Sequence, residues 1–315
     1  MEIERYTDAD YESWDAFSTE CTNATLLTTR GFLSYHGGRF EDCSVFLKDG
    51  EKILGAFPAA VSLDDQSVVV SHPGITYGGI IHAGALRGAR MIEALQQLKS
   101  YYREIGFAKL QYKVVPHIYT SRPSQDDLYA LFLEGASRFR CDLSCSIDLH
   151  NRPVPGSRRK RGLKKALKFV TISTDFSNLA DLHAVIVTNL EDKHDSLPVH
   201  SLDELELLAS RFPEEISICC ALIEGVVEAG VIFFKSSMVW HAQYIGSSAQ
   251  GYKVTALDAV FDSSIRDARD AGVRYFDFGT SNEEGGRVLN AGLYGFKSEF
   301  GGSGVVHEYY QLDLK

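Results

Sequence analysis

The pattern of apolar and polar positions predicts a chain in which strands and helices alternate. Two pairs of apolar runs enclose short turn sequences, Asp49-Gly50 in the first pair and Glu224-Gly225 in the second, so each pair is expected to form a β-hairpin. Other apolar runs bounded by turn residues predict further strands. These strands cover residues 67–71, 107–114, 141–149, 169–173, 239–246, 273–278 and 305–312.

Helices are expected where apolar residues recur at intervals of three or four. Between Ala89 and Gly106 the apolar positions follow this spacing, and Gly106 ends the pattern. Ser201 is expected to cap a second such helix over residues 202–212, with Glu204 completing a capping box. The other expected helices cover approximately residues 8–20, 126–139, 158–168, 178–191, 255–271 and 288–299.

The segment from Asn151 to Ser157 is the predicted domain boundary, because it holds two prolines and a glycine in seven residues. This divides the chain into residues 1–152 and 153–315. On both sides the elements follow the order helix, hairpin, strand, helix, strand, helix, strand. The repeated order predicts a duplicated α+β unit.

With 315 residues, of which 44% are hydrophobic and 23% charged, the chain is long enough for two domains with cores of their own. We find no apolar run of membrane-spanning length, and the amino end, beginning Met1-Glu2, is too acidic for a signal peptide. The six cysteines show neither zinc-binding nor secreted-disulfide spacing. We therefore expect a cytoplasmic protein without a metal or a membrane-inserted segment.

The net charge of −10 disfavours nucleic acid and acidic membranes as partners of the surface as a whole. One segment departs from that balance, since residues 158–168 contain seven Lys and Arg and no acid. The remainder of the chain then carries about −17 (−10 minus 7). This basic helix is either a solvated face or a phosphate-binding element, with Arg158 and Arg159 as the candidate ligands.

Polar residues follow the predicted strand at residues 273–278, where ligand sites of α/β sheets are usually found. Asp277 stands between two phenylalanines, and its burial is costly unless a ligand, a lysine or backbone groups pair with it. Ser281 and Asn282 come next, either as ligand-contacting residues or as an ordinary turn. Lys297 lies between Phe296 and Phe300, which indicates a positioned cation. We interpret these runs as the floor of an acyl-transfer site.

Three of these stretches resemble the Fem-type branch of the GNAT acyltransferase superfamily. They are Phe276-Asp277-Phe278-Gly279, Gly295-Phe296-Lys297-Ser298-Glu299-Phe300-Gly301-Gly302 and the basic run from Arg158 to Ala166. The resemblance covers residues 157–314 and is weaker in the first half. It implies a mixed-sheet α/β GNAT fold with two tandem domains and an amine acceptor bound in a cleft between them. The family's Phe-Lys-x-x-Phe-Gly lysine, implicated in catalysis, is Lys297 here.

The resemblance also implies acyl-coenzyme A as the donor. GNAT enzymes hold its pyrophosphate with a Gln/Arg-x-x-Gly-x-Gly/Ala turn at a helix start, and the corresponding residues 245–255 do not match that motif. The segment is nevertheless small, polar and unopposed by acids, so its backbone N–H groups are expected to bind phosphate. The candidate coenzyme ligands are Ser247, Ser248, Gln250, Gly251, Tyr252, Lys253, Ser281 and Asn282.

An attacking amine must lose a proton, and the oxyanion that forms needs a hydrogen-bond donor. Lys297 is the expected donor, and a surface lysine paired with Glu299 is the alternative. His194 and His200 are the candidate bases, because an unperturbed histidine titrates near neutral pH. His200 otherwise only precedes the helix cap, and zinc binding by the pair is disfavoured because no third ligand lies nearby.

The acceptor is expected to contact two loops of the first half, whose sequences resemble stretches of acyltransferases from sugar pathways. Their rings offer flat faces and hydrogen bonds to a sugar or base, and simple packing of loop aromatics is the alternative. The candidate acceptor-binding residues are His72, Tyr77, Lys113, His117 and Tyr119, with Tyr244 from the second half.

The resemblance as a whole implies an N-acyltransferase that moves an acetyl or 3-hydroxybutanoyl group from acyl-coenzyme A to a dTDP- or UDP-linked amino sugar of a surface polysaccharide pathway. One alternative is aminoacyl transfer from tRNA to a peptidoglycan precursor. It is disfavoured because, outside the basic helix, 25 Lys and Arg (32 minus 7) face 42 acids. The other is a catalytically inactive GNAT-fold binding module, which the missing pyrophosphate motif favours. The sequence does not define the oligomeric state.

Overall fold

The computed structural model describes residues 1–194 and 196–315, except for the side chains of residues 193 and 194. The chain forms two compact units. Unit 1 comprises Met1–Leu143, Asn282–Val288 and Val306–Lys315, and unit 2 comprises Ser144–Ser281 and Leu289–Val305. The chain changes unit at Leu143–Ser144, Ser281–Asn282, Val288–Leu289 and Val305–Val306, whereas a single division at residue 152 was predicted.

Unit 1 contains a small antiparallel sheet of order β1-β2-β3. It also contains a run of hydrogen-bonded strands in the order β4-β5-β6-β15. The bounds are β1 Glu2–Arg5, β2 Val45–Asp49, β3 Lys52–Phe57, β4 Ala60–Val61, β5 Val68–Val70, β6 Lys109–Lys113, β15 Ser303–Asp313, α1 Tyr11–Glu20, α2 Arg30–Leu33, α3 Ala89–Glu104 and α4 Asp126–Leu133. The predicted first hairpin is confirmed as β2 and β3, and Gly50 at its turn has the positive φ of +57° that favours glycine.

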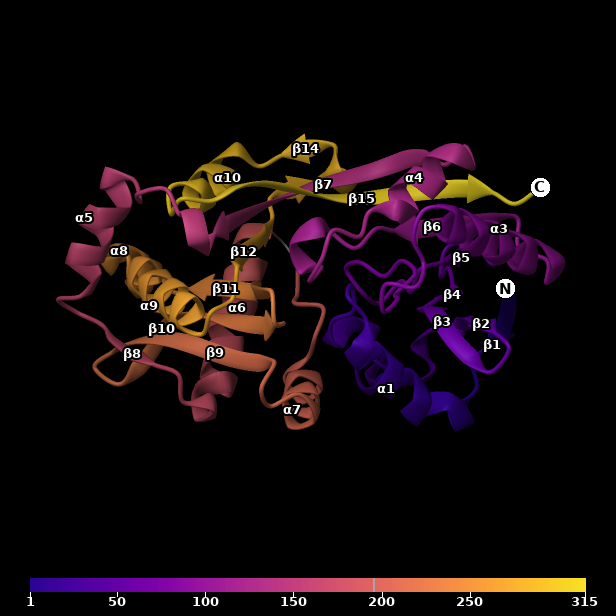
Figure 1. The fold of residues 1–315 in the computed structure, drawn as a ribbon. Helices are drawn as coiled ribbons and strands as arrows, with labels where there is room; N and C mark the ends of the chain where they lie inside the picture. Colours follow the sequence, from indigo (N-terminus) through magenta and orange to yellow (C-terminus); the bar gives the residue numbers. More distant parts are fainter. Residues whose placement is uncertain (195) are drawn as a thin grey trace. The chain divides into compact units, whose positions relative to one another are not determined.

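The core of unit 1 forms where α3 packs against the strands. Leu95 and Leu98 of α3 lie in one buried cluster with Leu47 of β2, Phe57 of β3 and Leu110 of β6. Figure 1 shows α3 running beside β5 and β6. The helical spacing of the apolar residues therefore predicted both the helix and its buried face.

Unit 2 contains a run of hydrogen-bonded strands in the order β15-β7-β12-β11-β10-β9-β8. Its elements are β7 Ser137–Asp148, β8 Thr171–Ser173, β9 Ile216–Ile223, β10 Val226–Lys235, β11 Val239–Ser247, β12 Tyr275–Thr280, α5 Ser157–Ala166, α6 Leu179–His194, α7 Leu202–Arg211, α8 Ala249–Val254, α9 Ala256–Asp270 and α10 Ala291–Ser298. β13 (Asn282–Glu283) and β14 (Val288–Leu289) form a separate two-stranded sheet. Strands β7 and β15 contribute residues to both units.

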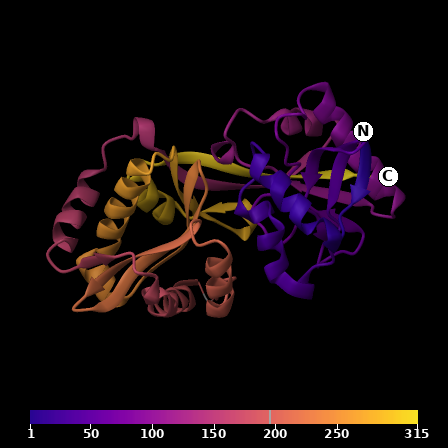
Figure 2. The same cartoon turned by 60° about the horizontal axis from the view of Figure 1, so that its bottom comes forward.

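Helices cover both faces of the β9-β10-β11 sheet in unit 2. Val231 and Phe233 of β10 lie in one cluster with Phe261 of α9. Because side chains alternate along a strand, Gly230 faces the other side, where a Cβ would come within 2.7 Å of Leu182 of α6. The sheet is thus enclosed by α9 on one face and α6 on the other (Figures 1 and 2).

The predicted second hairpin is confirmed as β9 and β10, and the capping box of Ser201 and Glu204 is present at the start of α7. Two predicted helices are wrong in their extent. The helix expected over residues 288–299 begins at Ala291, after strand β14. The helix expected over residues 126–139 ends at Leu133, and β7 begins at Ser137. Gly135 adopts a φ of +73°, the left-handed conformation that ends helices, and the chain then extends.

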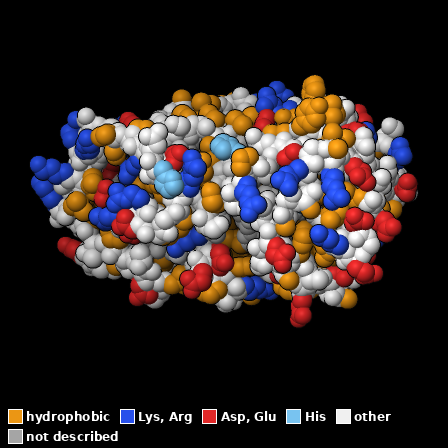
Figure 3. All heavy atoms as spheres, viewed as in Figure 1, with side chains coloured by type: hydrophobic (Ala, Val, Ile, Leu, Met, Phe, Trp, Pro, Cys, Tyr) orange, Lys and Arg blue, Asp and Glu red, His pale blue; other side chains and the backbone are white. Residues whose placement is uncertain are grey.

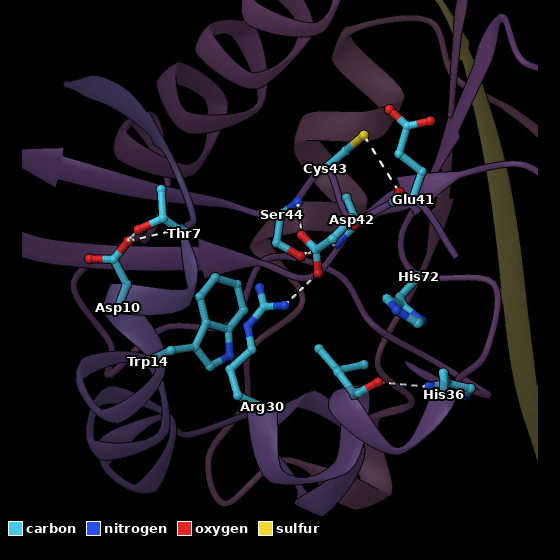
Figure 4. A network of polar contacts seen from close by, with 12 residues as sticks. Thr7, Asp10, Trp14, Arg30, His36, Glu41, Asp42, Cys43, Ser44 and His72 are labelled. Carbon is cyan, nitrogen blue, oxygen red and sulfur yellow. Dashed lines mark hydrogen bonds and ion pairs between the residues drawn. The ribbon is translucent and has the colours of Figure 1, made fainter. Parts of the chain in front are cut away.

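A buried arginine joins the early elements of unit 1 (Figure 4). The guanidinium carbon of Arg30 lies 3.4 Å from the ring centroid of Tyr6 and 4.0 Å from that of Trp14. Its Nη1 pairs with the Asp42 carboxylate at 2.5 Å, and the side chain is 4% exposed. Because two aromatic faces and one carboxylate stabilise this cation, its removal leaves a cavity and takes one partner from the Asp42 carboxylate, which still accepts from the Ser44 N–H at 2.8 Å.

We expect Arg30→Ala to lower the free energy of unfolding by about 3 kcal/mol, because a largely buried ion pair and two cation–π contacts are lost together. Thermal unfolding measures this as a Tm roughly 5–10 °C lower. Arg103→Ala, which removes an exposed arginine from the last turn of α3, is the control and should cost less than about 1 kcal/mol. Equal Tm values for the two variants would contradict the structural role of Arg30.

Candidate active site

Strand β12 directs one carboxylate away from the aromatic core of unit 2. The rings of Phe276 and Phe278 pack against Phe261 of α9, with centroid distances of 6.2 and 4.9 Å. Asp277, between them, points to the opposite face and is fully buried. The aromatic run therefore fixes the direction of the carboxylate.

Three side chains bind the Asp277 carboxylate. Ser144 Oγ donates to Oδ1 at 2.6 Å, and Ser146 Oγ donates to the same oxygen. His241 Nδ1 lies 2.7 Å from Oδ2. The two serines stand two residues apart on β7, and His241 is the β11 residue that pairs with Asp277 in the parallel ladder. These contacts compensate the burial of Asp277, but the partners are two serines and a histidine, whereas the sequence suggested a ligand, a lysine or backbone groups.

A β-bulge interrupts β12 directly after Asp277. Against β7, Asp277 pairs with Ser146 and Thr280 with Ser144, so two residues of β12 oppose one of β7. Gly279 in the bulge has a φ of +76°. Because the bulge breaks the regular ladder, the carbonyl groups of Gly279 and Thr280 are available to another donor.

Lys297 is that donor. It lies in the last turn of α10, and its Nζ donates to the carbonyl oxygens of Gly279 at 2.9 Å and Thr280 at 2.7 Å. The residue is only 3% exposed, which excludes the alternative of a solvated surface lysine paired with Glu299. An ammonium has three protons, and these two contacts use two of them.

Burial lowers the pKa of Lys297 to about 8, and the negative charge of Asp277 opposes this shift. The cation is therefore retained at neutral pH, but it lies near its titration point. The nearby Cys145 thiol has its pKa raised by burial to about 12, so it remains a thiol at neutral pH. A lysine that is charged at neutral pH can stabilise a negative charge, whereas a protonated thiol is a weak nucleophile. The two pKa values therefore favour a role for Lys297 in stabilising negative charge and disfavour Cys145 as a nucleophile.

The strands beside this cluster separate. The parallel ladder between β11 and β12 covers three residue pairs and ends at His241 and Asp277. Beyond His241, β11 continues to Ser247 in its ladder with β10. The ring of His241 lies beside Gly279, where a Cβ would come 3.4 Å from Cε1. The β11–β12 ladder therefore ends at His241, and the ring of His241 lies beside the bulge of β12.

His241 was missed by the sequence reasoning, which selected His194 and His200 from a polar loop. The signal was present, since His241 lies on a predicted strand near the second-half hairpin. Recognising it required the register that places it beside Asp277. No spacing within the sequence encodes that register directly.

The two predicted bases differ in outcome. The side chain of His194 lies outside the described residues. His200 is buried, and its Nδ1 lies 2.6 Å from the hydroxyl of Tyr244, which also accepts a hydrogen bond from the His200 backbone N–H at 3.1 Å. The structure therefore brings together the predicted base His200 and the predicted acceptor ligand Tyr244, on a part of β11 beyond His241.

The predicted coenzyme segment forms the six-residue helix α8, which Ser248 caps by accepting from Gly251 N–H at 3.0 Å. The expectation that no acid opposes this segment is wrong. The hydroxyl of Ser248 donates to the Glu228 carboxylate, and the Ser248 N–H donates to the Glu228 carbonyl at 2.8 Å. Glu228 precedes Ala229, which pairs with Ser247 across the β10–β11 ladder, so this proximity depends on strand register.

The other residues of that segment serve local structure or face solvent. Ser247 and Gly251 are buried, and a Cβ on Gly251 would come within 2.4 Å of the Glu228 carbonyl oxygen. Gln250 is exposed, and Tyr252 accepts from Asn189 Nδ2 at 3.2 Å. The Lys253 carbonyl accepts from Lys165 Nζ.

The two residues after β12 have different environments. Ser281 is 2% exposed, and its hydroxyl has no hydrogen-bond partner among the described residues. Asn282 accepts from the Leu143 backbone N–H at 2.5 Å through Oδ1. The Ser281 hydroxyl can therefore still bind a ligand near the bulge, whereas the Asn282 side chain is engaged by the Leu143 backbone in unit 1.

The predicted acceptor loops of unit 1 converge, mainly on each other. Lys113 Nζ donates to the carbonyls of His72, Pro73 and Ile75 at 3.1, 3.3 and 2.7 Å, and burial lowers its pKa to about 7. Burial also lowers the pKa of His72, whose ring lies 5.2 Å from that of His36 (Figure 4). These contacts show a packed loop.

The remaining side chains of these loops are the two tyrosines and His117. The rings of Tyr77 and Tyr119 are buried, with their centroids 4.5 Å apart. His117 is exposed, although partial burial of its ring lowers its pKa. An acceptor approaching this part of unit 1 would meet His117 before either tyrosine.

The two arginines of the basic helix are unlike each other. Arg158 is exposed, with the Glu299 carboxylate 3.9 Å away. Arg159 is buried between Asp258 at 3.1 Å and Glu299 at 2.9 Å, and it lies over the rings of Phe296 and Phe300. These contacts engage Arg159 in joining α5 to α9 and α10.

Two further observations concern the described part of the chain. None of its helices combines the length and the apolar character needed to span a bilayer. In the same residues, no group of three or more His, Cys, Asp and Glu side chains is arranged to hold a metal ion.

Comparisons with known proteins agree with this architecture. Residues 156–296 match the family model described as an acetyltransferase (GNAT) domain. A search of curated proteins found no match.

Solved structures extend the likeness across the chain. FemX is 11% identical with a TM-score of 0.70, and the alignment covers 99% of this chain and 97% of that one. L-PGS from Bacillus licheniformis is 14% identical with a TM-score of 0.64, covering 96% and 92%. A tandem GNAT protein from the clavulanic acid pathway is 10% identical with a TM-score of 0.55, covering 100% and 98%. The chain therefore has the predicted mixed α/β GNAT fold, and its residues 156–296 match the acetyltransferase (GNAT) domain model.

Proposed function

We propose that the chain is an N-acyltransferase that moves an acyl group from a coenzyme A thioester to an amine, with its chemistry in unit 2. The observation that carries this proposal is the buried ammonium of Lys297, fixed by two carbonyl groups beside the Asp277–His241 pair. A preorganised cation in a site with little water stabilises developing negative charge strongly. A carboxylate-oriented histidine is suited to accept a proton.

In the proposed reaction the amine nitrogen attacks the thioester carbonyl carbon, and a carbon–nitrogen bond forms. The third proton of the Lys297 ammonium stabilises the negative charge on the carbonyl oxygen. The proton lost by the amine passes to His241, whose imidazolium Asp277 stabilises. The carbon–sulfur bond then breaks, and the leaving thiolate takes up the proton held by the His241 imidazolium, which returns the imidazole to its neutral form. No covalent enzyme intermediate is formed, so Cys145 is dispensable.

The donor assignment is supported by the acetyltransferase domain match and by the end of the β11–β12 ladder. Backbone groups beyond the end of that ladder suit an extended ligand that contains amides, such as the arm of coenzyme A. The buried Ser281 hydroxyl lacks a partner among the described residues and is a further candidate contact.

The Glu228 carboxylate beside Ser248 argues against pyrophosphate at the start of α8, since two anions would repel there. The residues of α8 therefore fit a coenzyme phosphate poorly.

The acceptor remains the less constrained half of the proposal. A nucleotide-linked amino sugar is the acceptor that the sequence resemblance implies. The described contacts supply no residue that selects it. The acyl chain, the dTDP or UDP carrier and the cytoplasmic location likewise stay predictions.

A second candidate is aminoacyl transfer. One of the solved neighbours, from Agrobacterium fabrum, is named a putative lysylphosphatidylglycerol synthetase domain, with a TM-score of 0.59 and 12% identity. An aminoacyl donor would use the same Lys297 and His241 chemistry on an ester. Folded tRNA is bound by positive charge spread over a broad surface. This chain has a net charge of −10, and its run of positive charge is confined to the basic helix.

A donor assay separates these functions. Thiol release from acetyl-coenzyme A is measured with a panel of amines that includes dTDP- and UDP-amino sugars, and the same acceptors are then offered charged tRNA. Acceptor-dependent thiol release supports the proposal. Transfer from charged tRNA alone supports the second candidate, and no transfer from either donor supports an inactive binding module.

We expect Lys297→Met to lower kcat for thiol release about 10²–10³-fold, because one oxyanion donor is lost. The wild-type kcat should also fall as pH rises through about 8, since the lowered pKa leaves the ammonium charged below that value and neutral above it. Lys235→Met is the matched control, because it removes another partly buried lysine of unit 2, one that lies over Trp240. A pH profile that is unchanged in Lys297→Met would contradict the assigned role.

We expect His241→Gln to lower kcat/KM about 10²–10⁴-fold through loss of the proton acceptor. Ser144→Ala removes one of the two hydroxyls on Asp277 and should give a smaller loss. His150→Gln, at an exposed position outside the candidate site, is the control for histidine replacement. The assignment fails if folded His241→Gln retains wild-type kcat/KM at every pH.

A further inference from the structure

A strongly basic surface lies on α5, outside the catalytic cluster. Of the seven cations in residues 158–168, six are exposed and only Arg159 is buried. The six are Arg158, Lys160, Arg161, Lys164, Lys165 and Lys168. Lys and Arg side chains gather over α5 in the space-filling view (Figure 3). The proposed acyl transfer does not use these charges.

The inner face of α5 fixes the direction of these side chains. Arg159 pairs with Asp258 of α9, and Gly162 lies so close to α9 that a Cβ would come 2.7 Å from the Asp258 carboxylate. Ala166, one turn further on, is fully buried. Because these three positions are spaced along one side of the helix, the remaining positions face solvent. The helix is therefore held with its basic side outward.

Large apolar side chains stand exposed at both ends of this basic helix. Val154, before it, is 75% exposed, and Leu167 and Phe169, after it, are 62% and 53% exposed. A solvated basic face needs no such residues, and their exposure to water is unfavourable. Basic residues beside exposed aliphatic and aromatic residues are the combination found in elements that lie on lipid surfaces. We call Val154, Leu167, Phe169 and the six cations the α5 surface.

An arginine-lined cavity adjoins the α5 surface. A cavity of about 520 Å³ is lined by Arg152, Arg266 and Arg269, and Val154 is part of its wall. A second one, of about 210 Å³, shares Arg152, Pro155 and Asp262 with the first and reaches Lys160 of α5. The two cavities therefore connect α9, the linker before α5 and α5 itself.

The cations of the larger cavity suit a phosphate group. Arg152 Nε donates to the Phe300 carbonyl at 3.1 Å, which orients the guanidinium. Burial lowers the pKa of Arg152, and the positive charge of Arg269 lowers it further while Asp262 opposes both. Planar guanidinium groups bind phosphate oxygens in pairs. A phosphate here would compete with two carboxylates, since Asp262 lines the cavity and Arg269 pairs with Asp270 at 3.3 Å.

We propose that the α5 surface docks on an anionic phospholipid bilayer, with headgroup phosphates entering the cavity of Arg152, Arg266 and Arg269. The rest of the chain carries about −17 (−10 minus 7) and is repelled by such a bilayer, so only this face approaches it. Leu167 and Phe169 enter the boundary between headgroups and acyl chains. These apolar residues distinguish a bilayer from a nucleic acid, whose phosphates offer them no apolar contact. The proposal does not depend on the proposed acyl transfer.

The test is co-sedimentation of the full chain with vesicles at 100 mM salt. Vesicles of phosphatidylcholine are compared with vesicles in which a third of the lipid is phosphatidylglycerol. We expect binding to the anionic vesicles only, weakening steeply with added salt. Equal binding to both vesicle types, or to neither, overturns the proposal. So does binding to a folded RNA of similar charge density with no binding to anionic vesicles.

Charge variants locate the surface. Lys160→Gln, Arg161→Gln, Lys164→Gln and Lys168→Gln are combined, and we expect at least tenfold weaker binding to anionic vesicles. The matched control combines Lys52→Gln, Arg87→Gln, Arg90→Gln and Arg103→Gln, all at exposed positions of unit 1. Both variants carry a net charge of −14 (−10 minus 4), so a general charge effect weakens them equally. Equal binding by the two variants overturns the proposal.

Two further variants separate the apolar contacts and the cavity. The double variant Leu167→Ser with Phe169→Ser should bind vesicles severalfold more weakly. The dependence of its binding on salt concentration should be unchanged, because no charge is removed. Arg266→Gln with Arg269→Gln should weaken binding and make it less sensitive to competition by inorganic phosphate. Wild-type binding by both double variants would overturn the docking geometry. Circular dichroism and Tm measurements establish that each variant is folded.

Discussion

The fully buried carboxylate of Asp277 is the constraint on which unit 2 depends. A buried charge is tolerated only when neighbouring groups compensate it, and here two serines of β7 and His241 of β11 do so. These partners lie on the strands on either side of β12. The carboxylate therefore requires the strand order β7-β12-β11 and the register that aligns Ser146 and His241 with it. The aromatic residues on either side of Asp277 bind β12 to α9 and prevent the strand from turning over.

The candidate site follows from that constraint. The bulge after Asp277 releases the carbonyl groups of Gly279 and Thr280, and these fix the ammonium of Lys297 inside the unit. Phe296 and Phe300 pack on Phe261, which anchors both ends of the segment that carries Lys297. A proton acceptor and a cation are thereby held around one short stretch of backbone where the β11–β12 ladder ends. This arrangement is what acyl transfer to an amine requires.

The sequence predicted the parts of this site that depend on local pattern. The hairpins, the apolar face of α3 and the capping box at Ser201 follow from spacing and turn chemistry, and Lys297 followed from its position between two phenylalanines. The partners of Asp277 did not, because Ser144 and His241 come from strands far away in the sequence. The same limit applies to Glu228, whose approach to Ser248 depends on the β10–β11 register. Arg159 appeared equivalent to its neighbours in a basic run, yet helical phase alone buries it against Asp258.

The most direct test of the account is a crystal structure with a ketone analogue of acetyl-coenzyme A, in which a methylene replaces the sulfur and transfer is blocked. The account predicts the ketone oxygen about 2.7–3.1 Å from Lys297 Nζ, with the carbonyl carbon open to an amine near His241. An analogue bound elsewhere in the chain, or one whose ketone oxygen is beyond hydrogen-bond distance of Lys297, would contradict it.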